Sequence, residues 1–302
     1  MNTSYYSNGK LLLTGEYAIL DGATGLAVPT KFGQWLHVNV ANNNQLQWTS
    51  LDHNDKPWFT AKYSLPELQI TESNDEAKAT TLQKILKAVR LQKSSFLNDL
   101  KTGYTVETKL SFPTDWGLGS SSTLINNIAQ WANIDAFNLL GQTLGGSGYD
   151  LACAQHMTPI LYHLDLGNPQ VFPTAFKPEF ADRLYFIHLN QKQNSREAIA
   201  TYRSKVFNKQ ALLEQINHIT QQMLEASSLE LFESLLIEHE MALSEILEIA
   251  PLKRKFPDYF GALKSLGAWG GDFILATGNE KTPDYFKAKG FTTVLSYEEM
   301  VL

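Results

Sequence analysis

The sequence predicts a mixed α+β fold in two domains, and three observations lead to this expectation. Strand patterns and turn signals fill residues 5–40, and alternating apolar and polar residues mark a further strand over 104–112. Apolar residues at helical spacing recur over 82–89 and along 196–249. The 302 residues suffice for two ordinary domains, and Pro169, Pro173 and Pro178 mark a candidate linker. We therefore expect domains at residues 1–178 and 179–302.

Composition places the chain among soluble globular proteins, with 43% hydrophobic and 19% charged residues. The net charge of −6 argues against nucleic acid as the main partner, because phosphate backbones favour clustered Lys and Arg. No apolar run approaches the roughly 18 residues that cross a bilayer, and the first residues do not resemble a secretion signal. Cys153 is the only cysteine, which excludes an intramolecular disulfide. We expect a cytoplasmic protein that binds no membrane, and a homodimer is left open.

The first 165 residues read mainly as strands joined by turns. Asp21-Gly22 is a strong hairpin signal between two apolar segments. An amphipathic helix is expected around Leu82–Val89, and Leu151–Ala154 begins another. The expected strands are Lys10–Leu13, Leu26–Pro29, Gln34–Val40, Leu46–Thr49, Trp58–Thr60, Tyr104–Phe112 and Pro159–Leu164.

The last 120 residues combine long helices with short strands. Helices are expected over 196–205 and 209–249, with a division at Ser227-Ser228. His239 stands in E-H-E, which favours a solvated helix face. Strands are expected at Leu184–Leu189, Phe273–Thr277 and Phe291–Leu295, with a glycine loop at 267–271 before the second and a helix at Asp284–Lys289 before the third.

The most informative stretch is P-T-D-W-G-L-G-S-S-S-T, residues 113–123, between a predicted strand and a predicted helix. Serines are favoured N-caps, and a helix start carries unpaired N–H groups and partial positive charge that suit phosphate. Gly117 and Gly119 allow close approach of the backbone to an anion. The hydroxyls of Ser120, Ser121 and Ser122 can add hydrogen bonds or reach a metal ion.

This loop matches neither of the two commonest phosphate-binding loops. A Walker loop needs Gly-Lys-Ser/Thr, and no lysine follows Gly119. The dinucleotide fingerprint needs a glycine where Ser122 stands. A capped strand-to-helix turn without a ligand is therefore the alternative interpretation. Motifs elsewhere in the chain are needed to choose between this turn and a phosphate-binding loop.

Three other stretches accompany the loop in a fixed order. N-G-K-L-L-L-T-G-E-Y (8–17) precedes it, and G-S-G-Y-D (146–150) and K-S-L-G-A-W-G-G-D (264–272) follow. Together the four resemble the motifs of the GHMP kinase superfamily, named for galactokinase, homoserine kinase, mevalonate kinase and phosphomevalonate kinase. The serine loop matches most specifically. Lys10 and G-S-G-Y-D favour the mevalonate or phosphomevalonate kinase side.

The resemblance implies a role for each matching residue. The backbone of the loop would hold the phosphates of ATP, and Ser121 would help to hold Mg2+. Asp150 would accept the proton of the substrate hydroxyl, with Lys10 nearby to keep it ionised. Glu16 and Tyr17 would lie near the acceptor. The nucleotide-binding set is Gly117, Leu118, Gly119, Ser120, Ser121 and Ser122.

Each of these residues also has a simpler interpretation. Asp150 could cap the helix that starts at Leu151, and Lys10 could be an edge or surface lysine in an apolar strand. Beside the serine loop, the functional interpretation is favoured for both.

Two features depart from the family pattern. The family places a Mg2+-binding glutamate after the serine loop, whereas Asp135 is the only acid between Thr123 and Tyr149 here. Either Asp135 substitutes, or serine, phosphates and water hold the metal. Trp269 and Asp272 stand where the family has small residues, and a carboxylate near phosphates is unfavourable unless it faces Mg2+ or points away.

The resemblance implies the two-domain GHMP kinase fold. The first domain would resemble domain 2 of ribosomal protein S5, and the second would be a ferredoxin-like sandwich. The expected activity is transfer of the γ-phosphate of ATP to a hydroxyl or phosphate of a small metabolite, with Mg2+, and a mevalonate-like or phosphomevalonate-like acceptor. Two alternatives stay open: a degenerate member that binds without catalysis, and a lyase like diphosphomevalonate decarboxylase.

Overall fold

The computed structural model describes residues 2–99, 101–191, 195–269 and 271–302. Its helices and strands form a mixed α+β structure, as the sequence predicts. By packing, the chain divides into two compact units. Unit 1 comprises residues 1–9, 32–114 and 119–155, and unit 2 comprises 10–31, 115–118 and 156–302. This division differs from the expected 1–178 and 179–302, and those domain bounds stay a prediction.

Two long strands, β1 (Asn2–Leu12) and β2 (Gly25–Ala41), contribute to both units and pair with each other. In unit 1 the strand order is β5-β4-β3-β6-β2. β3 and β6 run parallel, and the remaining pairs along this order are antiparallel, with Val38 opposite Val106. The bounds are β3 Gln45–Leu51, β4 Pro57–Ser64, β5 Gln69–Ser73 and β6 Gly103–Leu110.

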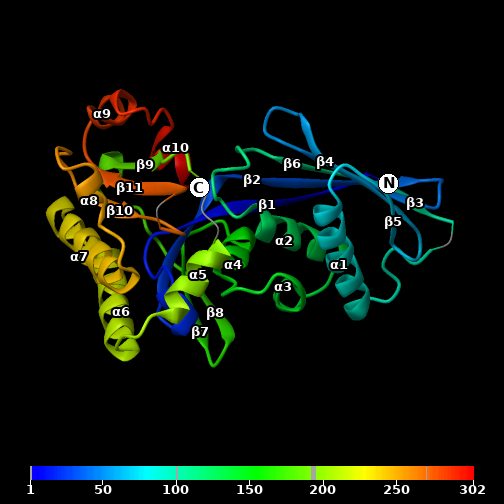
Figure 1. The fold of residues 1–302 in the computed structure, drawn as a ribbon, viewed down its shortest axis with the longest axis horizontal. Helices are drawn as coiled ribbons and strands as arrows, with labels where there is room; N and C mark the ends of the chain where they lie inside the picture. The colour runs from blue at the N-terminus through cyan, green and yellow to red at the C-terminus, as the bar shows by residue number, and fades with distance from the viewer. Residues whose placement is uncertain (1, 100, 192–194, 270) are drawn as a thin grey trace. The chain divides into compact units, whose positions relative to one another are not determined.

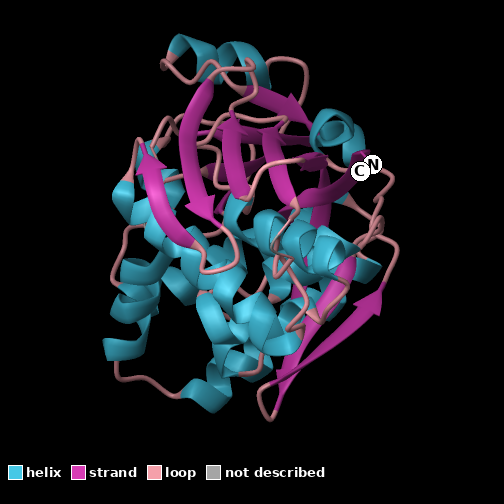
Figure 2. Ribbon diagram, turned by 90° about the vertical axis from the view of Figure 1, so that its right-hand side faces the viewer, coloured by secondary structure: helices cyan, strands magenta, loops and turns pink. Residues whose placement is uncertain are grey.

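Helices α1 (Glu76–Gln92), α2 (Ser120–Ala132) and α3 (Ala136–Thr143) line one face of these strands (Figure 1). Figure 2 distinguishes the helices from the strands of the chain by colour. The core between them includes Trp48 from the sheet and Leu86, Ile125 and Leu139 from the helices, all nearly inaccessible to water. The expected helix at 82–89 is confirmed as part of α1, whereas α3 and β5 were not expected.

A buried polar group in unit 1 fixes α2 against β1 and β2. The Asn127 side chain accepts a hydrogen bond from the Ser7 hydroxyl (2.7 Å) and donates one to the Gln34 carbonyl (2.9 Å). The Thr123 hydroxyl donates to the Gln34 side chain at 2.8 Å. Because buried polar groups need partners, these contacts specify how α2 lies on the two strands.

Unit 2 contains an antiparallel sheet of order β10-β11-β9-β12, in which Phe186 pairs with Leu275. The bounds are β9 Leu184–His188, β10 Leu263–Ser265, β11 Phe273–Thr277 and β12 Val294–Ser296. The strands expected at 184–189 and 273–277 are confirmed, whereas the last strand is shorter and begins later than Phe291. The smaller helices of unit 2 are α5 Ser195–Ser204, α8 Leu252–Lys255, α9 Thr282–Ala288 and α10 Tyr297–Met300. A 3-10 helix, η2, spans Ala181–Arg183.

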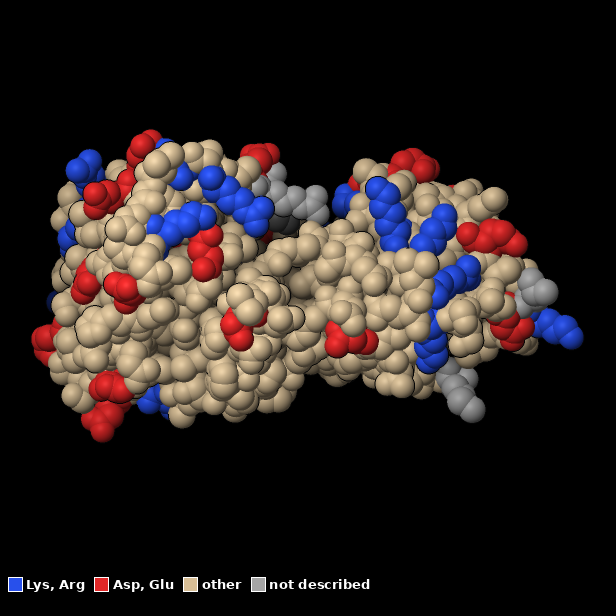
Figure 3. Space-filling model, turned by 90° about the horizontal axis from the view of Figure 1, so that it is seen from below, with Lys and Arg blue, Asp and Glu red and all other residues tan. Residues whose placement is uncertain are grey.

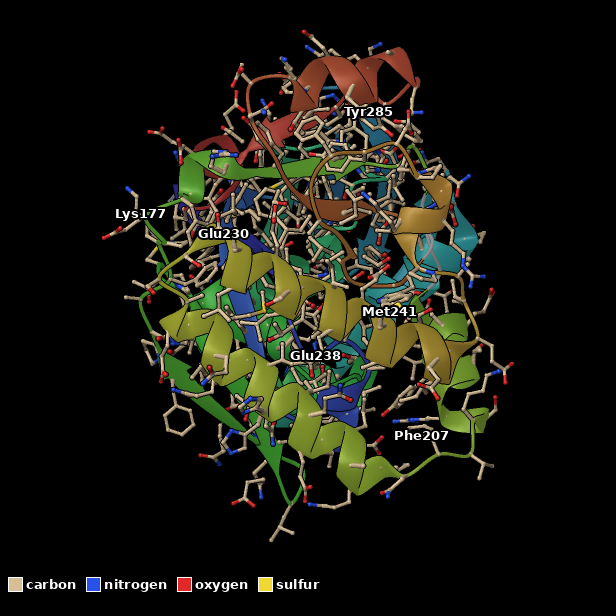
Figure 4. The ribbon with its side chains drawn as sticks, turned by 90° about the vertical axis from the view of Figure 1, so that its left-hand side faces the viewer. Lys177, Phe207, Glu230, Glu238, Met241 and Tyr285 are labelled. Atoms are coloured by element: carbon tan, nitrogen blue, oxygen red, sulfur yellow. The ribbon has the colours of Figure 1, made fainter. Side chains whose placement is uncertain are left out.

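The longest helices of unit 2 are α6 (Lys209–Glu225) and α7 (Leu229–Leu247), which lie side by side in Figure 4. The Ser228 side chain caps α7, so the division expected at Ser227-Ser228 is confirmed. Glu238, labelled on α7, accepts a hydrogen bond from Gln215 of α6 at 3.1 Å. The opposite side of α7 contacts β10.

Two expectations about turns are wrong. Pro169 and Pro173 lie in β8 (Asn168–Pro173), which pairs with β7 (Ile160–Asp165), and not in a linker. Proline is tolerated there because β8 is an edge strand with one unpaired side. Asp21-Gly22 does not form a hairpin turn, because residues Ala18–Asp21 form a 3-10 helix, η1. The Asp21 carboxylate is instead held by Tyr202 and Lys209 at 2.7 and 2.8 Å.

Acidic and basic side chains are both present on the face shown in Figure 3, and much of that face carries neither. Among the helices that the structure describes, none combines the length and hydropathy that crossing a membrane requires.

We predict that Asn127→Ala lowers the free energy of unfolding by about 2 kcal/mol, because it leaves buried groups of Ser7 and Gln34 without their partner. Denaturant unfolding measures this change. Asn138→Ala, on the exposed side of α3, is the matched control and should shift stability by less than about 0.5 kcal/mol. Equal effects of the two substitutions would contradict the role of the buried group.

Candidate active site

The serine loop begins in unit 2, where residues 115–118 rest on the small sheet. The His188 Nε2 atom lies 3.2 Å from the Asp115 carbonyl oxygen. The Trp116 ring packs edge-on against Phe273, with 5.3 Å between centroids. Residues at the ends of β9 and β11 therefore hold the start of the loop.

Lys10 is the second support of the loop in unit 2. Its Nζ donates to the Gly117 carbonyl at 3.1 Å, and its backbone N–H donates to the Leu118 carbonyl at 3.2 Å. The residue is only 9% exposed, so it is not the surface lysine of the alternative interpretation. The structure thus brings together three of the predicted site residues, Lys10, Gly117 and Leu118.

Asp272 packs directly against this part of the loop. Gly117 has φ +65°, and a Cβ added to it would lie 2.4 Å from the Asp272 carboxyl carbon. A side chain at this position would therefore have to displace the Asp272 carboxylate and adopt a strained backbone conformation. Asp272 itself adopts φ +51° and is tied to Gln191 by a backbone hydrogen bond of 2.7 Å. The carboxylate that departs from the family pattern thus points at the loop.

The loop continues in unit 1, where it leads into α2. Gly119, with φ +86°, is the N-cap residue, and Ser120, Ser121 and Ser122 form the first turn of the helix. The expectation that serine caps this helix is wrong, because the left-handed backbone at the cap suits glycine. No side chain of the described residues caps α2, so its first N–H groups and its dipole suit an anion.

The two candidate acids of unit 1 have different settings. Asp150 is the second residue of α4 (Tyr149–Gln155), inside the helix and past the N-cap position of the alternative interpretation. α4 packs against α2, and the Gln155 side chain donates to the Asn126 side chain at 3.0 Å. Asp135 is the N-cap of α3, where its carboxylate accepts from the Asn138 N–H at 2.7 Å.

Glu16 lies in a buried charged cluster of unit 2, which we call the Glu16 cluster: Glu16, His239, Glu240 and Lys264. The Glu16 side chain is 1% exposed, and one carboxylate oxygen accepts from the Lys264 ammonium. Its other oxygen lies 3.4 Å from the His239 Nε2 and has no hydrogen-bond partner among the described residues. Glu240 completes the cluster by accepting from the backbone N–H groups of Ser265 and Leu252 at 2.8 and 3.1 Å.

The backbone has positive φ on both sides of Glu16. Tyr17 has φ 61° and ψ −47°, and the Ala18 N–H donates to the Glu16 carbonyl at 2.7 Å. This geometry is a γ-turn with positive φ, a rare conformation that costs about 1–3 kcal/mol. Gly15 has φ +91°, and a Cβ there would lie 2.9 Å from the Gly25 Cα.

The side chain of Tyr17 is held on two sides. Its ring stacks on Tyr202 with 5.5 Å between centroids, and its hydroxyl oxygen accepts from the Trp269 backbone N–H at 3.2 Å. Tyr202 in turn contacts the Phe207 ring, labelled in Figure 4, with 5.4 Å between ring centroids. Burial raises the pKa of Tyr17 to about 12, so the phenol stays protonated near pH 7.

Sequence reasoning missed His239 and Lys264. The expectation that His239 lies on a solvated helix face is wrong, because it is fully buried. Its position is three residues after Leu236 and four before Leu243, which is the buried stripe of α7. That spacing could have identified it. Lys264 offers no such signal, because a lysine within a three-residue strand is ordinarily exposed.

Burial dominates the ionisation of the Glu16 cluster. It raises the pKa of Glu16 to about 7, although the Lys264 charge acts in the opposite direction. Burial and then the Lys264 charge hold the pKa of His239 well below its usual range. His239 is therefore neutral near pH 7. Since its Nε2 accepts from the Gly15 N–H at 2.9 Å, the proton of the ring is on Nδ1.

These two shifts predict opposite effects of pH on stability. Glu16 binds more protons in the folded state between about pH 4.5 and 7, so its contribution to the unfolding free energy falls as pH rises through that window. His239 binds more protons in the unfolded state below about pH 6.5, so its contribution rises with pH up to that point. Over the shared window the two contributions oppose each other.

We predict that His239→Gln removes the histidine contribution. Below about pH 6.5 the variant should lose stability relative to the wild type by about 1.4 kcal/mol for each unit of rising pH. Denaturant unfolding across this range measures the difference, with Glu238→Gln as the control from the exposed side of α7. Parallel curves for wild type and His239→Gln would contradict the buried neutral state of His239.

Comparison with known proteins places this site on a known fold. No family model matches the chain, and no curated protein matches its sequence. Solved structures do match over nearly the whole chain. The mevalonate kinase of Methanococcus jannaschii has a TM-score of 0.71 at 16% identity, covering 98% of this chain and 97% of its own.

Two further structures were solved with ligands. The L. major mevalonate kinase, in complex with R-mevalonate, gives a TM-score of 0.70 at 15% identity over 97% of this chain and 94% of its own. The Streptococcus pneumoniae phosphomevalonate kinase, in complex with phosphomevalonate and AMPPNP, gives a TM-score of 0.69 at 16% identity. The match covers 97% of this chain and 99% of that protein's chain. These proteins belong to the superfamily that the sequence motifs resemble. The resemblance is confirmed at the level of structure: the chain has the fold of the GHMP kinases.

Proposed function

We propose that this protein is an ATP-dependent small-molecule kinase that phosphorylates a hydroxyl or phosphate of a metabolite. The observation that carries the proposal is the hydrogen bond of Lys10 to the Gly117 carbonyl, which ties the first motif to the serine loop. The same loop then enters α2 without a side-chain cap. A lysine beside a glycine loop and an open helix start is an arrangement that favours polyphosphate.

The residues of the loop fit the phosphates of ATP. Gly117 and Gly119 both have positive φ, which lets the backbone approach an anion closely, and Ser120, Ser121 and Ser122 form the first turn of α2. In phosphoryl transfer the protein mainly positions the groups and neutralises charge. Lys10 supplies positive charge for this purpose, next to the backbone that it supports.

The transfer step assigns one role to Asp150. An oxygen of the acceptor attacks the γ-phosphorus of ATP, forming a new P–O bond, and the bond to the oxygen that ADP retains is broken. For a hydroxyl acceptor, the Asp150 carboxylate takes the proton that the attacking oxygen loses. Asp150 lies in the first turn of α4, one residue after Tyr149 and within G-S-G-Y-D.

The donor set suits Mg2+ bound mainly through ATP. The described residues contain no group of three His, Cys, Asp or Glu side chains that could hold a metal by themselves. Mg2+ needs only one or two protein carboxylates beside phosphates and water. Ser121 and Asp272 are the residues that we propose for it, because Asp272 points at Gly117 whereas Asp135 already caps α3. The ion would neutralise the charge of the phosphates.

A mevalonate-like or phosphomevalonate-like acceptor is favoured. The motifs of the chain favour that side of the superfamily, and two structures of the same fold hold R-mevalonate and phosphomevalonate. Glu16 and Tyr17 remain the proposed acceptor-side residues. Tyr17 suits direct contact, because its oxygen already accepts a hydrogen bond and its proton has no acceptor among the described residues. Glu16 is 1% exposed, so we propose that it supports the position of Tyr17 and does not contact the acceptor itself.

The two alternatives have distinct consequences. A decarboxylase-like lyase would consume ATP and release carbon dioxide from a diphosphorylated acid. A member without catalysis would bind nucleotide or metabolite and leave ATP intact. The Lys10 and Gly15-Glu16 motif favours the kinase. We also propose a cytoplasmic location and small-molecule partners, without nucleic acid or membrane.

We predict that ATP binds, that Mg2+ strengthens its binding, and that Ser121→Ala and Asp272→Asn each reduce the gain from Mg2+ by about tenfold in affinity. Asp272→Asn should also strengthen binding of ATP without Mg2+, because a carboxylate beside phosphates is removed. Isothermal titration calorimetry measures both effects, with the exposed Asp284→Asn as control. An unchanged Mg2+ gain in Asp272→Asn would contradict its role.

We predict that Asp150→Asn retains ATP affinity but lowers the turnover number by at least about 100-fold. Release of ADP in the presence of R-mevalonate or phosphomevalonate measures turnover, and carbon dioxide release is followed in a parallel assay with diphosphomevalonate. A wild-type chain that binds no ATP at millimolar concentration would contradict the kinase proposal. Stoichiometric carbon dioxide would support the lyase instead.

A further inference from the structure

The γ-turn at Tyr17 is held in place by side chains that come from distant parts of unit 2. Gly15 precedes the turn, and its N–H donates to His239 Nε2 of α7 at 2.9 Å. Glu16 forms the first corner of the turn, and its carboxylate accepts from Lys264 of β10. Backbone conformations of this kind persist only where the surroundings over-determine them. Here the two residues before Tyr17 are each fixed by one side chain.

The anchors are themselves rigid. Lys264 is completely buried and also donates to the Ser265 carbonyl at 2.9 Å. Glu240 accepts from the Ser265 N–H and hydroxyl at 2.8 and 3.1 Å, which fixes β10 to α7. Every member of the Glu16 cluster is at most 3% exposed. Rotation of any of these side chains would break a buried hydrogen bond.

Stability alone does not account for this cluster. Taking an ammonium and a carboxylate out of water is costly, and well-packed apolar residues at such sites often give an equal or more stable protein. A buried charge pair beside a strained turn therefore favours a role in the precise placement of the turn. The side chain that this turn places is Tyr17, whose ring and hydroxyl are fixed by Tyr202 and Trp269.

We propose that His239 and Lys264 are positioning residues for the acceptor, acting through Gly15 and Glu16 to hold the γ-turn that presents the Tyr17 hydroxyl. The inference rests on the proposed kinase function for its acceptor. The group that Tyr17 would recognise is an oxygen that accepts a hydrogen bond, such as a carboxylate, hydroxyl or phosphate oxygen.

The first test compares His239→Leu with His239→Gln. Leucine fills the buried space but accepts no hydrogen bond, whereas the glutamine oxygen can replace Nε2 as the acceptor for the Gly15 N–H. We expect His239→Leu to raise KM for R-mevalonate or phosphomevalonate about tenfold while KM for ATP changes by less than about twofold. His239→Gln should restore most of the loss. A merely structural role would change both KM values, or neither.

The second test removes both charges of the ion pair, in Glu16→Gln/Lys264→Met. Removing one partner would leave a buried unpaired charge, but removing both should leave the denaturant midpoint close to that of the wild type. The double variant should nevertheless show the same selective rise of KM for the acceptor. Glu238→Gln, labelled in Figure 4, and Lys287→Met are matched exposed controls, and both should behave as wild type. A double variant with wild-type acceptor kinetics would overturn the proposal.

A structural readout separates this inference from the proposed function. Hydrogen exchange of the Gly15 N–H, followed by residue-resolved NMR, reports this hydrogen bond directly. We expect exchange about tenfold faster in His239→Leu and near wild type in His239→Gln. A wild-type chain without turnover would contradict the kinase, and exchange that is equal in all variants would contradict the positioning role.

Discussion

The salt bridge between Glu16 and Lys264 is the interaction on which the candidate acceptor side depends. Both side chains are out of water, at 1% exposed or less, and they join a turn near the start of the chain to a strand near its end. Charges are buried at a cost, so the surrounding hydrogen bonds to His239, Ser265 and Glu240 are needed to keep the pair in one arrangement. The γ-turn at Tyr17 takes its shape from that arrangement.

The serine loop obeys a second constraint, which is the close approach of other groups to its glycines. Lys10 holds the Gly117 carbonyl from one strand, and Asp272 occupies the space where a side chain at 117 would lie. The chain then reaches α2 through a left-handed glycine rather than a capping serine. Among the described residues, no side chain caps the first N–H groups of this helix. We therefore propose that phosphate and Mg2+ bind at the uncapped start of α2.

Local sequence predicted the parts of this site that depend on neighbours along the chain. The glycines and serines of the loop, the lysine before Gly15-Glu16 and the division of α6 from α7 all follow from short motifs and helix periodicity. The same reasoning failed where distant residues decide the outcome. Gly15 and His239 are 224 positions apart and Glu16 and Lys264 are 248 apart, so no local pattern joins them. The pair Asp21-Gly22 is a local hairpin signal. The contacts of Asp21 with Tyr202 and Lys209, far away in the sequence, could not be predicted from it.

Phosphorus NMR can follow the proposed transfer of a phosphoryl group from ATP to the acceptor. The protein is incubated with ATP, Mg2+ and either R-mevalonate or phosphomevalonate, and the spectra are followed over time. We predict that the γ-phosphate signal of ATP declines while ADP and a phosphorylated acceptor appear in equal amounts. ADP and inorganic phosphate without a phosphorylated acceptor, or ATP that persists with both acceptors although it binds, would contradict a kinase for these metabolites.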